Sequence, residues 1–168
     1  TGLKQARTAA HGMDKLPIDR ILTSPLRRAR QTAQAVAVGR GIPVLVEEDI
    51  VEMAFGELEG QLLSDFPACE CIFSDPEHYV PLEGGESYAQ LDVRCRKLLE
   101  EILPPLEWRF HDVVLVSHGA FIRGVVCRVL GLPLKDFWDA PPQPNCSCTV
   151  LELKNGVCTL VEEGRVYG

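Results

Sequence analysis

Residues 21–29 place two basic side chains at the start of a predicted helix. A short apolar run leads into Ser24 and Pro25, which are typical of an N-cap and a first helical position, and Arg27 and Arg28 follow directly. An arginine at a strand-to-helix junction can bind an anion through its planar fork of N–H groups. The helix dipole disfavours cations there, so an ordinary solvated arginine pair is the competing interpretation.

Residues 116–119 form a second junction of the same kind. His118 and Gly119 follow a continuous β-branched and aliphatic run, so an imidazole and unpaired backbone N–H groups would leave the sheet together. Ligands of parallel α/β sheets bind beyond the carboxyl ends of the strands, and this arrangement suits an anion such as phosphate or sulfate. A histidine at a strand end can also have a purely structural role.

The elements around these junctions alternate between strand and helix, which predicts an α/β three-layer sandwich. We expect a mostly parallel sheet, with antiparallel strands at its edge formed by a hairpin around Asn155-Gly156. The helix after Ser24 should end near Arg40, and Pro104-Pro105 should stop another helix. The predicted strands cover residues 20–23, 44–47, 113–116, 146–153 and 157–162, and the predicted helices residues 2–11, 25–40, 86–103 and 120–130.

The composition predicts a soluble globular protein without a surface for nucleic acid or membranes. Of 168 residues, 46% are hydrophobic and 24% are charged, and no apolar run reaches the length of a membrane span. The net charge of −7 would on average repel nucleic acids and anionic lipids. The length suits one domain over residues 1–168, because no repeat or linker divides the chain.

Seven cysteines, an odd number within core-like segments, predict reduced thiols and a cytoplasmic location instead of a disulfide framework. A metal site remains an alternative, but zinc pairs usually have two or more intervening residues, so core packing explains these cysteines better. A cysteine nucleophile is a further alternative, yet no cysteine opens a glycine-rich phosphate loop that ends in arginine. The candidate metal groups are Cys69-Glu70-Cys71 with His78, and Cys146-Ser147-Cys148 with Cys158.

Taken together, two motifs resemble the histidine phosphatase superfamily, also called phosphoglycerate-mutase-like. They are residues 24–33 (Ser-Pro-Leu-Arg-Arg-Ala-Arg-Gln-Thr-Ala) and residues 113–119 (Val-Val-Leu-Val-Ser-His-Gly). The resemblance covers nearly the whole chain and implies an active site of two histidines, two arginines and an acidic residue around one phosphoryl group, without a metal or cofactor. Supporting matches occur at residues 2–6, 52–60 and 84–87 and at Asn145.

The resemblance assigns a role to each matching residue. Arg28 matches the arginine that binds the phosphoryl oxygens, and Arg27 is expected to face solvent. His118 matches the histidine that donates a hydrogen bond to the transferring phosphoryl group, next to the N–H of Gly119. Glu52 matches the acid that protonates the leaving oxygen and later activates water. Residues 84–87 are first a loop with a candidate N-cap at Glu86 or Ser87, with a substrate contact from Ser87 as a secondary hypothesis.

The superfamily's first strand ends in Arg-His-Gly and supplies the nucleophilic histidine, and it should lie upstream of Gly2. His11-Gly12 does not match it, because this pair follows the Gly-x-x-Gln-Ala helix and no β-branched strand precedes it. We interpret His11-Gly12 as the C-cap of that helix. Without the missing strand, we expect residues 1–168 to bind a substrate weakly and not to hydrolyse it.

Within the superfamily, the short interval between Glu52 and His118 is similar to the phosphatase branch, since the mutases carry longer insertions there. We therefore expect hydrolysis of a small phosphate monoester through a phosphohistidine. The α-ribazole phosphate phosphatases and the broad-specificity phosphatases are both similar in layout. The alternatives are an isomerase activity of the phosphoglycerate mutase type and a non-catalytic phosphate-binding regulator. The oligomeric state does not follow from the sequence.

Overall fold

A parallel sheet of three short strands forms the centre of the computed structural model, which describes residues 2–67, 71–139 and 143–167. β1 (Arg20–Thr23) is the middle strand, between β2 (Val44–Val46) and β3 (Val113–Val116). Thr23, the last residue of β1, lies beside Val116, the last residue of β3. The segments that follow these two strands therefore start side by side.

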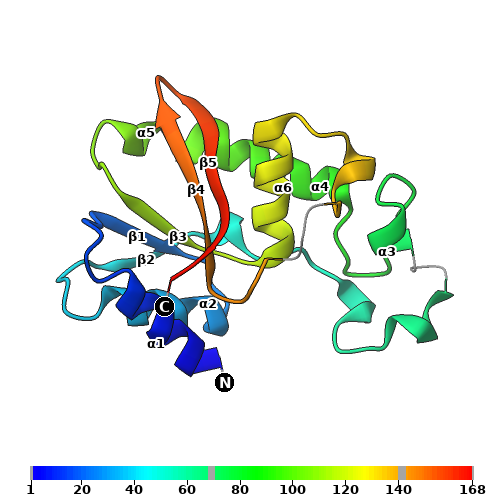
Figure 1. Ribbon diagram of the computed structural model, residues 1–168. Coiled ribbons are helices and arrows are strands. Elements are labelled where there is room, and N and C mark those ends of the chain that lie inside the picture. The colour runs from blue at the N-terminus through cyan, green and yellow to red at the C-terminus, as the bar shows by residue number, and fades with distance from the viewer. Residues whose placement is uncertain (1, 68–70, 140–142, 168) are drawn as a thin grey trace.

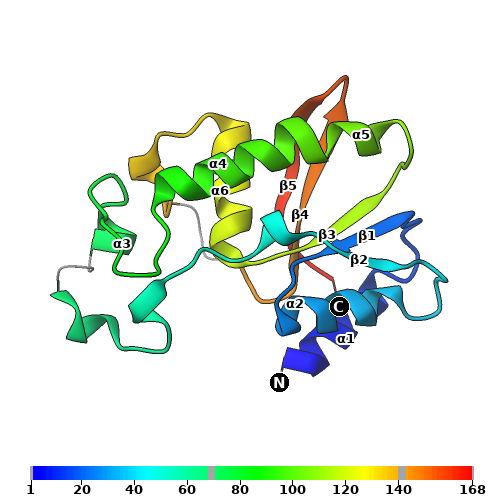
Figure 2. The ribbon, with the colours of Figure 1, turned by 180° about the vertical axis from the view of Figure 1, so that it is seen from behind.

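Helices cover both faces of this sheet (Figures 1 and 2). α1 (Gly2–Gly12) and α2 (Arg27–Ala37) lie on one face, and α4 (Tyr88–Lys97) and α6 (Gly119–Leu130) lie on the other. Along β3 the side chains alternate, since Val114 and Val116 pack with the α1–α2 side while Leu115 packs against the core that includes Phe121. The predicted three-layer α/β/α sandwich is confirmed.

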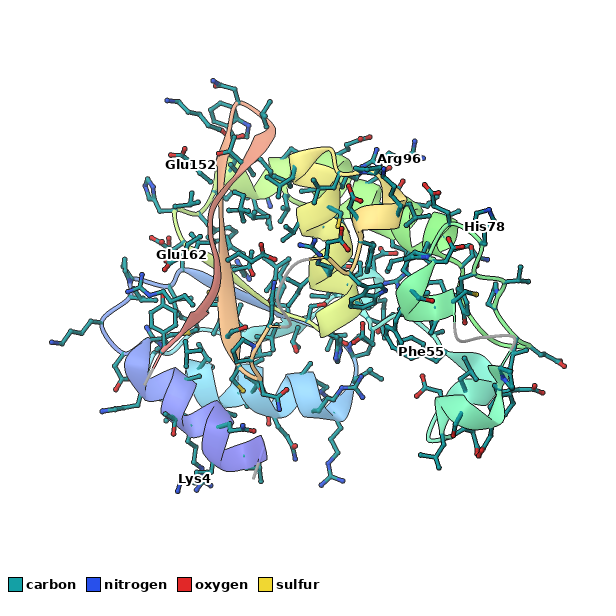
Figure 3. All side chains as sticks on the ribbon, turned by 45° about the vertical axis from the view of Figure 1, so that its right-hand side comes forward. Lys4, Phe55, His78, Arg96, Glu152 and Glu162 are labelled. Atoms are coloured by element: carbon teal, nitrogen blue, oxygen red, sulfur yellow. The ribbon has the colours of Figure 1, made fainter. Side chains whose placement is uncertain are left out.

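The carboxyl-terminal hairpin consists of β4 (Ser147–Lys154) and β5 (Val157–Val166). Asn155 and Gly156 join the strands with φ angles of 54° and 76°, as the two-residue turn signal predicts. Figure 3 shows Glu152 toward the tip of the hairpin and Glu162 further from it. The strands form a separate two-stranded sheet, which corrects the expectation that they extend the parallel sheet at its edge.

Several helix boundaries differ from the sequence-based prediction. α2 begins after Leu26, because the hydroxyl of Ser24 accepts a hydrogen bond from the Leu26 N–H at 3.3 Å and forms a turn instead of an N-cap. It ends at Ala37, before Gly39. Pro104 does not stop the helical run but begins another short helix, since proline is well tolerated at a first helical position.

The remaining helical elements are short. A π-helical segment, η5 (Leu98–Ile102), continues α4 and leads into α5 (Pro104–Glu107). Among the described residues no helix is long and apolar enough to cross a membrane. The other short elements are η1 (Glu48–Ile50), η2 (Gly56–Leu58), η3 (Leu63–Asp65), α3 (Cys71–Ser74) and η6 (Leu134–Asp136).

The loop between β2 and α3 is tied to the segment before α4 by a close backbone contact. Phe55 and Gly85 form an isolated antiparallel bridge, and Gly56 packs against the backbone of residues 83–85. A Cβ atom on Gly56 would lie 2.3 Å from the carbonyl oxygen of Glu83. Gly56 also has a φ of +56°, which side-chain-bearing residues rarely adopt. Glycine is therefore required here for two reasons.

We expect Gly56→Ala to destabilise the fold more than Gly60→Ala. Gly60 also has a positive φ, +74°, but a Cβ atom there would meet nothing within 4 Å, so its substitution should cost about 1–2 kcal/mol for backbone strain alone. Gly56→Ala adds a clash with backbone that cannot move aside, about 1–3 kcal/mol more. Urea denaturation of both variants measures the difference, and equal losses would contradict the close contact.

Candidate active site

The paired ends of β1 and β3 bring three polar side chains into contact. Ser24 continues β1 by one residue, since its N–H donates to the Val116 carbonyl at 2.9 Å. His118 follows β3 and forms the N-cap position of α6 in an extended conformation. Its Nε2 lies 2.7 Å from the Ser24 hydroxyl, and its Nδ1 lies 3.1 Å from Nε of Arg28. The two junctions singled out in the sequence thus form one cluster.

These contacts define the protonation state of His118. A guanidinium can only donate hydrogen bonds, so Nδ1 of His118 must accept from Arg28, and the proton of a neutral imidazole resides on Nε2 and points to Ser24. Burial lowers the pKa of His118 to about 4, and the positive charge of Arg28 acts in the same direction. His118 is therefore neutral at physiological pH when only protein groups surround it.

Arg28 projects from the first turn of α2 and is exposed. Its hydrogen bond to His118 uses one of the five N–H donors of the guanidinium, and among the described residues the other four make no hydrogen bond, so they can bind a ligand. Arg27 is also exposed. Among the described residues, the side-chain partners of His118 are Arg28 and Ser24, and Arg27 is not one of them. Of the two neighbouring arginines, Arg28 is the one that the fold turns toward the junction of β1 and β3.

Glu52 reaches this cluster from the loop between η1 and η2. Its Oε1 accepts hydrogen bonds from the backbone N–H groups of Met53 at 3.0 Å and Phe121 at 3.2 Å. Phe121 lies in the first turn of α6, so the carboxyl group is held at the positive end of a helix. Burial raises the pKa of Glu52, while these two hydrogen bonds and the nearby charge of Arg28 oppose the rise.

The other two predicted site residues occupy helix starts. Ser87 caps α4 in a reciprocal capping box, in which its hydroxyl accepts from the Gln90 N–H and the Gln90 side chain accepts from the Ser87 N–H. Gly119 is the first residue of α6, so its N–H has no acceptor within the helix. The contact of the Ser24 hydroxyl with His118 was not predicted, because a serine before a proline and a helix was interpreted as an N-cap.

The alternative metal ligands do not converge in the part of the chain that the structure describes. Cys146 precedes β4 with a φ of 60°, although the predicted strand over residues 146–153 had included it together with Cys148. Cys148 packs on the α1–α2 side, and Cys158 packs with the other core. No group of three or more His, Cys, Asp or Glu occurs among these residues; Cys69 and Glu70 lie outside them.

His11 and Gly12 are the last two helical residues of α1, one step inside the C-cap position that the sequence suggested. His11 is exposed, and its Nδ1 lies 2.8 Å from a carboxylate oxygen of Asp14. His78 makes a similar surface pair with Asp75. Figure 3 places His78 on the α3 side of the molecule, away from Lys4 in α1. Neither histidine contributes to the cluster around His118.

Arg28, His118 and Glu52 correspond to three of the five active-site groups that the resemblance to the histidine phosphatase superfamily implies. A model of the histidine phosphatase superfamily (branch 1) matches residues 1–165. The chain belongs to this superfamily. The resemblance noted from the motifs of residues 24–33 and 113–119 is thereby confirmed, although the roles of the individual residues stay predictions.

Relatives within the superfamily differ in the substrates for which they are named. A phosphoserine phosphatase 1 of Hydrogenobacter thermophilus is 33% identical, over 82% of this chain and 66% of that protein. An adenosylcobalamin/alpha-ribazole phosphatase of Salmonella typhimurium is 26% identical, over 95% of this chain and 79% of its own. The structure of a mycobacterial glucosyl-3-phosphoglycerate phosphatase with inorganic phosphate is 26% identical, with a TM-score of 0.81 over 98% and 84% of the two chains.

We expect Arg28→Met to weaken the binding of inorganic phosphate about 10- to 100-fold, because each hydrogen bond to a charged group contributes about 1.5–3 kcal/mol. Arg27→Met is the matched control, since it removes the same charge one residue earlier and should change affinity by less than about threefold. Isothermal calorimetry or phosphorus NMR measures both affinities. Equal losses in the two variants would indicate a general charge effect and not a site at Arg28.

The lowered pKa of His118 predicts a stability that depends on pH. Because the unfolded state binds a proton near pH 6.5 and the folded state only near pH 4, the free energy of unfolding should fall as the pH drops through this window. His118→Gln should remove this component, which amounts to about 3 kcal/mol between pH 7 and pH 4. Urea denaturation of parent and variant across this range measures it, and a difference independent of pH would refute the assignment.

Proposed function

We propose that this protein hydrolyses a small phosphate monoester through a phosphohistidine intermediate. The observation that carries the proposal is the hydrogen-bonded pair of Arg28 and His118 at the start of α6, with Glu52 held by the same helix. An arginine fork, an imidazole and a carboxyl group of raised pKa supply the charge neutralisation and the proton that phosphoryl transfer needs.

In this proposal Arg28 binds two oxygens of the phosphoryl group through its unused N–H donors. A phosphoryl oxygen then takes the place of the Arg28 Nε as the neighbour of Nδ1 in His118. The negative charge of the phosphate raises the pKa of the imidazole, which gains a second proton and donates a hydrogen bond to the phosphate. Ser24 keeps the ring oriented through Nε2 during this change.

Glu52 is the proposed general acid. Desolvation favours the protonated form of its carboxyl group, which can then supply a proton to the leaving alkoxide as the P–O bond breaks. After the alcohol departs, the same carboxylate accepts a proton from the water that attacks the phosphohistidine. The two roles alternate, so each turnover returns Glu52 to its starting state.

The nucleophile requires a second imidazole beside Arg28. The sequence contains four histidines, and the three besides His118 (His11, His78 and His111) are exposed on other elements. The proposal therefore uses the histidine that the superfamily resemblance places on a strand before Gly2. Catalytic tests accordingly use protein that carries this strand, whereas binding tests can use residues 1–168.

The names of the relatives support a general substrate class but not one particular substrate. They are named for phosphoserine, alpha-ribazole phosphate and glucosyl-3-phosphoglycerate, which are all small phosphate monoesters of alcohols. We propose the same class for this protein, with release of inorganic phosphate instead of transfer to a second alcohol as in a mutase. A panel of these esters, assayed for free phosphate, tests both points.

A cytoplasmic location is part of the proposal and is supported by the thiols. Cys95 and Cys127 are free and buried, and burial raises the pKa of Cys95 to about 12 and also raises that of Cys127. Buried protonated thiols of this kind are typical of a core that folds in a reducing compartment.

We expect Glu52→Gln to slow the hydrolysis of an alkyl phosphate about 10²- to 10⁴-fold, because a basic alkoxide needs a proton to leave. The same variant should slow formation of the phosphohistidine from p-nitrophenyl phosphate much less, since p-nitrophenolate leaves without one. Single-turnover measurements separate this step from hydrolysis of the phosphohistidine, in which Glu52 acts as a base.

Glu57→Gln serves as a control for this experiment, because Glu57 is an exposed carboxylate in the same loop. It should leave both substrates unaffected. If Glu52→Gln slows phosphohistidine formation equally for the two substrates, Glu52 is not the general acid.

A further inference from the structure

The loop that carries Glu52 has little regular structure of its own, yet a partly buried ion pair contacts it on both sides of Glu52. Arg94 of α4 and Glu86, just before that helix, form a two-pronged pair with distances of 2.8 and 2.7 Å. Their side chains are only 18% and 13% exposed. We propose that this Arg94–Glu86 pair is the positioning device for Glu52, an inference that rests on the function proposed above.

Arg94 fixes the chain immediately before Glu52. Its Nη1 donates to the carbonyl oxygens of Asp49 at 2.8 Å and Val51 at 2.9 Å. A lysine could not make both of these bonds while also pairing with two oxygens of Glu86, because its ammonium is a single point of charge without a planar fork. The guanidinium therefore couples the carboxylate pair to the backbone of the loop.

Glu86 fixes the chain immediately after Glu52. Its backbone N–H donates to the carbonyl of Ala54 at 2.7 Å, and its Oε2 accepts from the N–H of Ala54 at 3.3 Å. The adjacent bridge between Phe55 and Gly85 continues this contact. Glu52 is thus bracketed, with Arg94 holding residues 49 and 51 and Glu86 holding residue 54.

Arg94 also contacts the helix to which Glu52 binds. Its guanidinium carbon lies 5.0 Å from the centre of the Phe121 ring, and the backbone N–H of Phe121 is a hydrogen-bond donor to Glu52. Arg94 therefore contacts both the loop that contains Glu52 and Phe121, whose backbone N–H binds the Glu52 carboxyl group. Displacement of the guanidinium would loosen Glu52 relative to α6 without removing any group that touches the substrate.

The arrangement gives a positioning function to residues 84–87, Gly-Gly-Glu-Ser. Gly85 allows the bridge to Phe55, Glu86 pairs with Arg94, and Ser87 caps the helix from which Arg94 projects. Ser87 thus supports the Arg94–Glu86 pair by capping α4 with its hydroxyl group.

The first test needs no catalysis and uses the 168-residue chain. Titration of the Glu52 carboxyl carbon by NMR, assigned with Glu52→Gln, should show its raised pKa in the parent protein. In Arg94→Lys and in Glu86→Gln this pKa should move toward the ordinary value of a glutamate, because the loosened carboxyl group gains contact with water. Folded variants with an unchanged Glu52 titration would overturn the proposal.

Arg128→Met is the matched control. Arg128 also links α4 to α6, through Asp92 at 2.8 Å, but neither residue is among the hydrogen-bond partners of the Glu52 loop. The variant should leave the Glu52 titration unchanged. A shift as large as that of Arg94→Lys would mean that any loosening of α4 and α6 has this effect, and would overturn the specific role of Arg94.

The second test uses protein with the strand expected before Gly2. Arg94→Lys should lower the rate of phosphohistidine formation from an alkyl phosphate about tenfold or more relative to that from p-nitrophenyl phosphate, whereas Arg128→Met should not change this ratio. A merely structural role would slow both substrates equally, which would overturn the proposal. Absence of hydrolysis by the parent would instead refute the proposed function, and the titration would still decide the role of Arg94.

Discussion

The parallel pairing of β1 with β3 is the interaction on which the candidate site depends. It aligns Thr23 with Val116, so the two chain segments leave the sheet at the same height and side by side. Arg28 and His118, 90 residues apart in the sequence, meet only because of this register. A shift of the pairing by one residue would reverse the faces to which β3 directs its side chains. The same register therefore buries the apolar side chains of β3 and brings Arg28 next to His118.

The site combines one permanent charge with two groups whose charge depends on their surroundings. Burial favours the neutral form of both His118 and Glu52, by lowering the pKa of the first and raising that of the second. The unliganded cluster thus presents the positive charge of Arg28 beside a neutral imidazole, an arrangement suited to a phosphate dianion. The backbone N–H groups at the start of α6 add hydrogen-bond donors to the site without adding a charged side chain.

Irregular backbone requires a different kind of support from that of a strand or helix. β1 and β3 hold their junctions by ladder hydrogen bonds, whereas residues 49–54 are held by side chains of distant elements, chiefly Arg94 and Glu86. Ser117 is a third side chain that holds this loop, since its hydroxyl donates to the Ile50 carbonyl at 2.7 Å. This division explains how the loop can present the Glu52 carboxyl group at a fixed place although residues 51–54 belong to no strand or helix.

The sequence alone determined the five strands and the four longer helices, although not the short helices α3 and α5, because β-branched runs and apolar periodicity are local properties of the chain. It also indicated Arg28 and His118 by their positions after strands, and the superfamily resemblance added Glu52. The tertiary structure alone decided that Ser24 contacts His118, and that Arg94 pairs with Glu86 around the Glu52 loop. It also placed the hairpin in a sheet of its own. These features depend on contacts between segments far apart in the chain, which local patterns cannot encode.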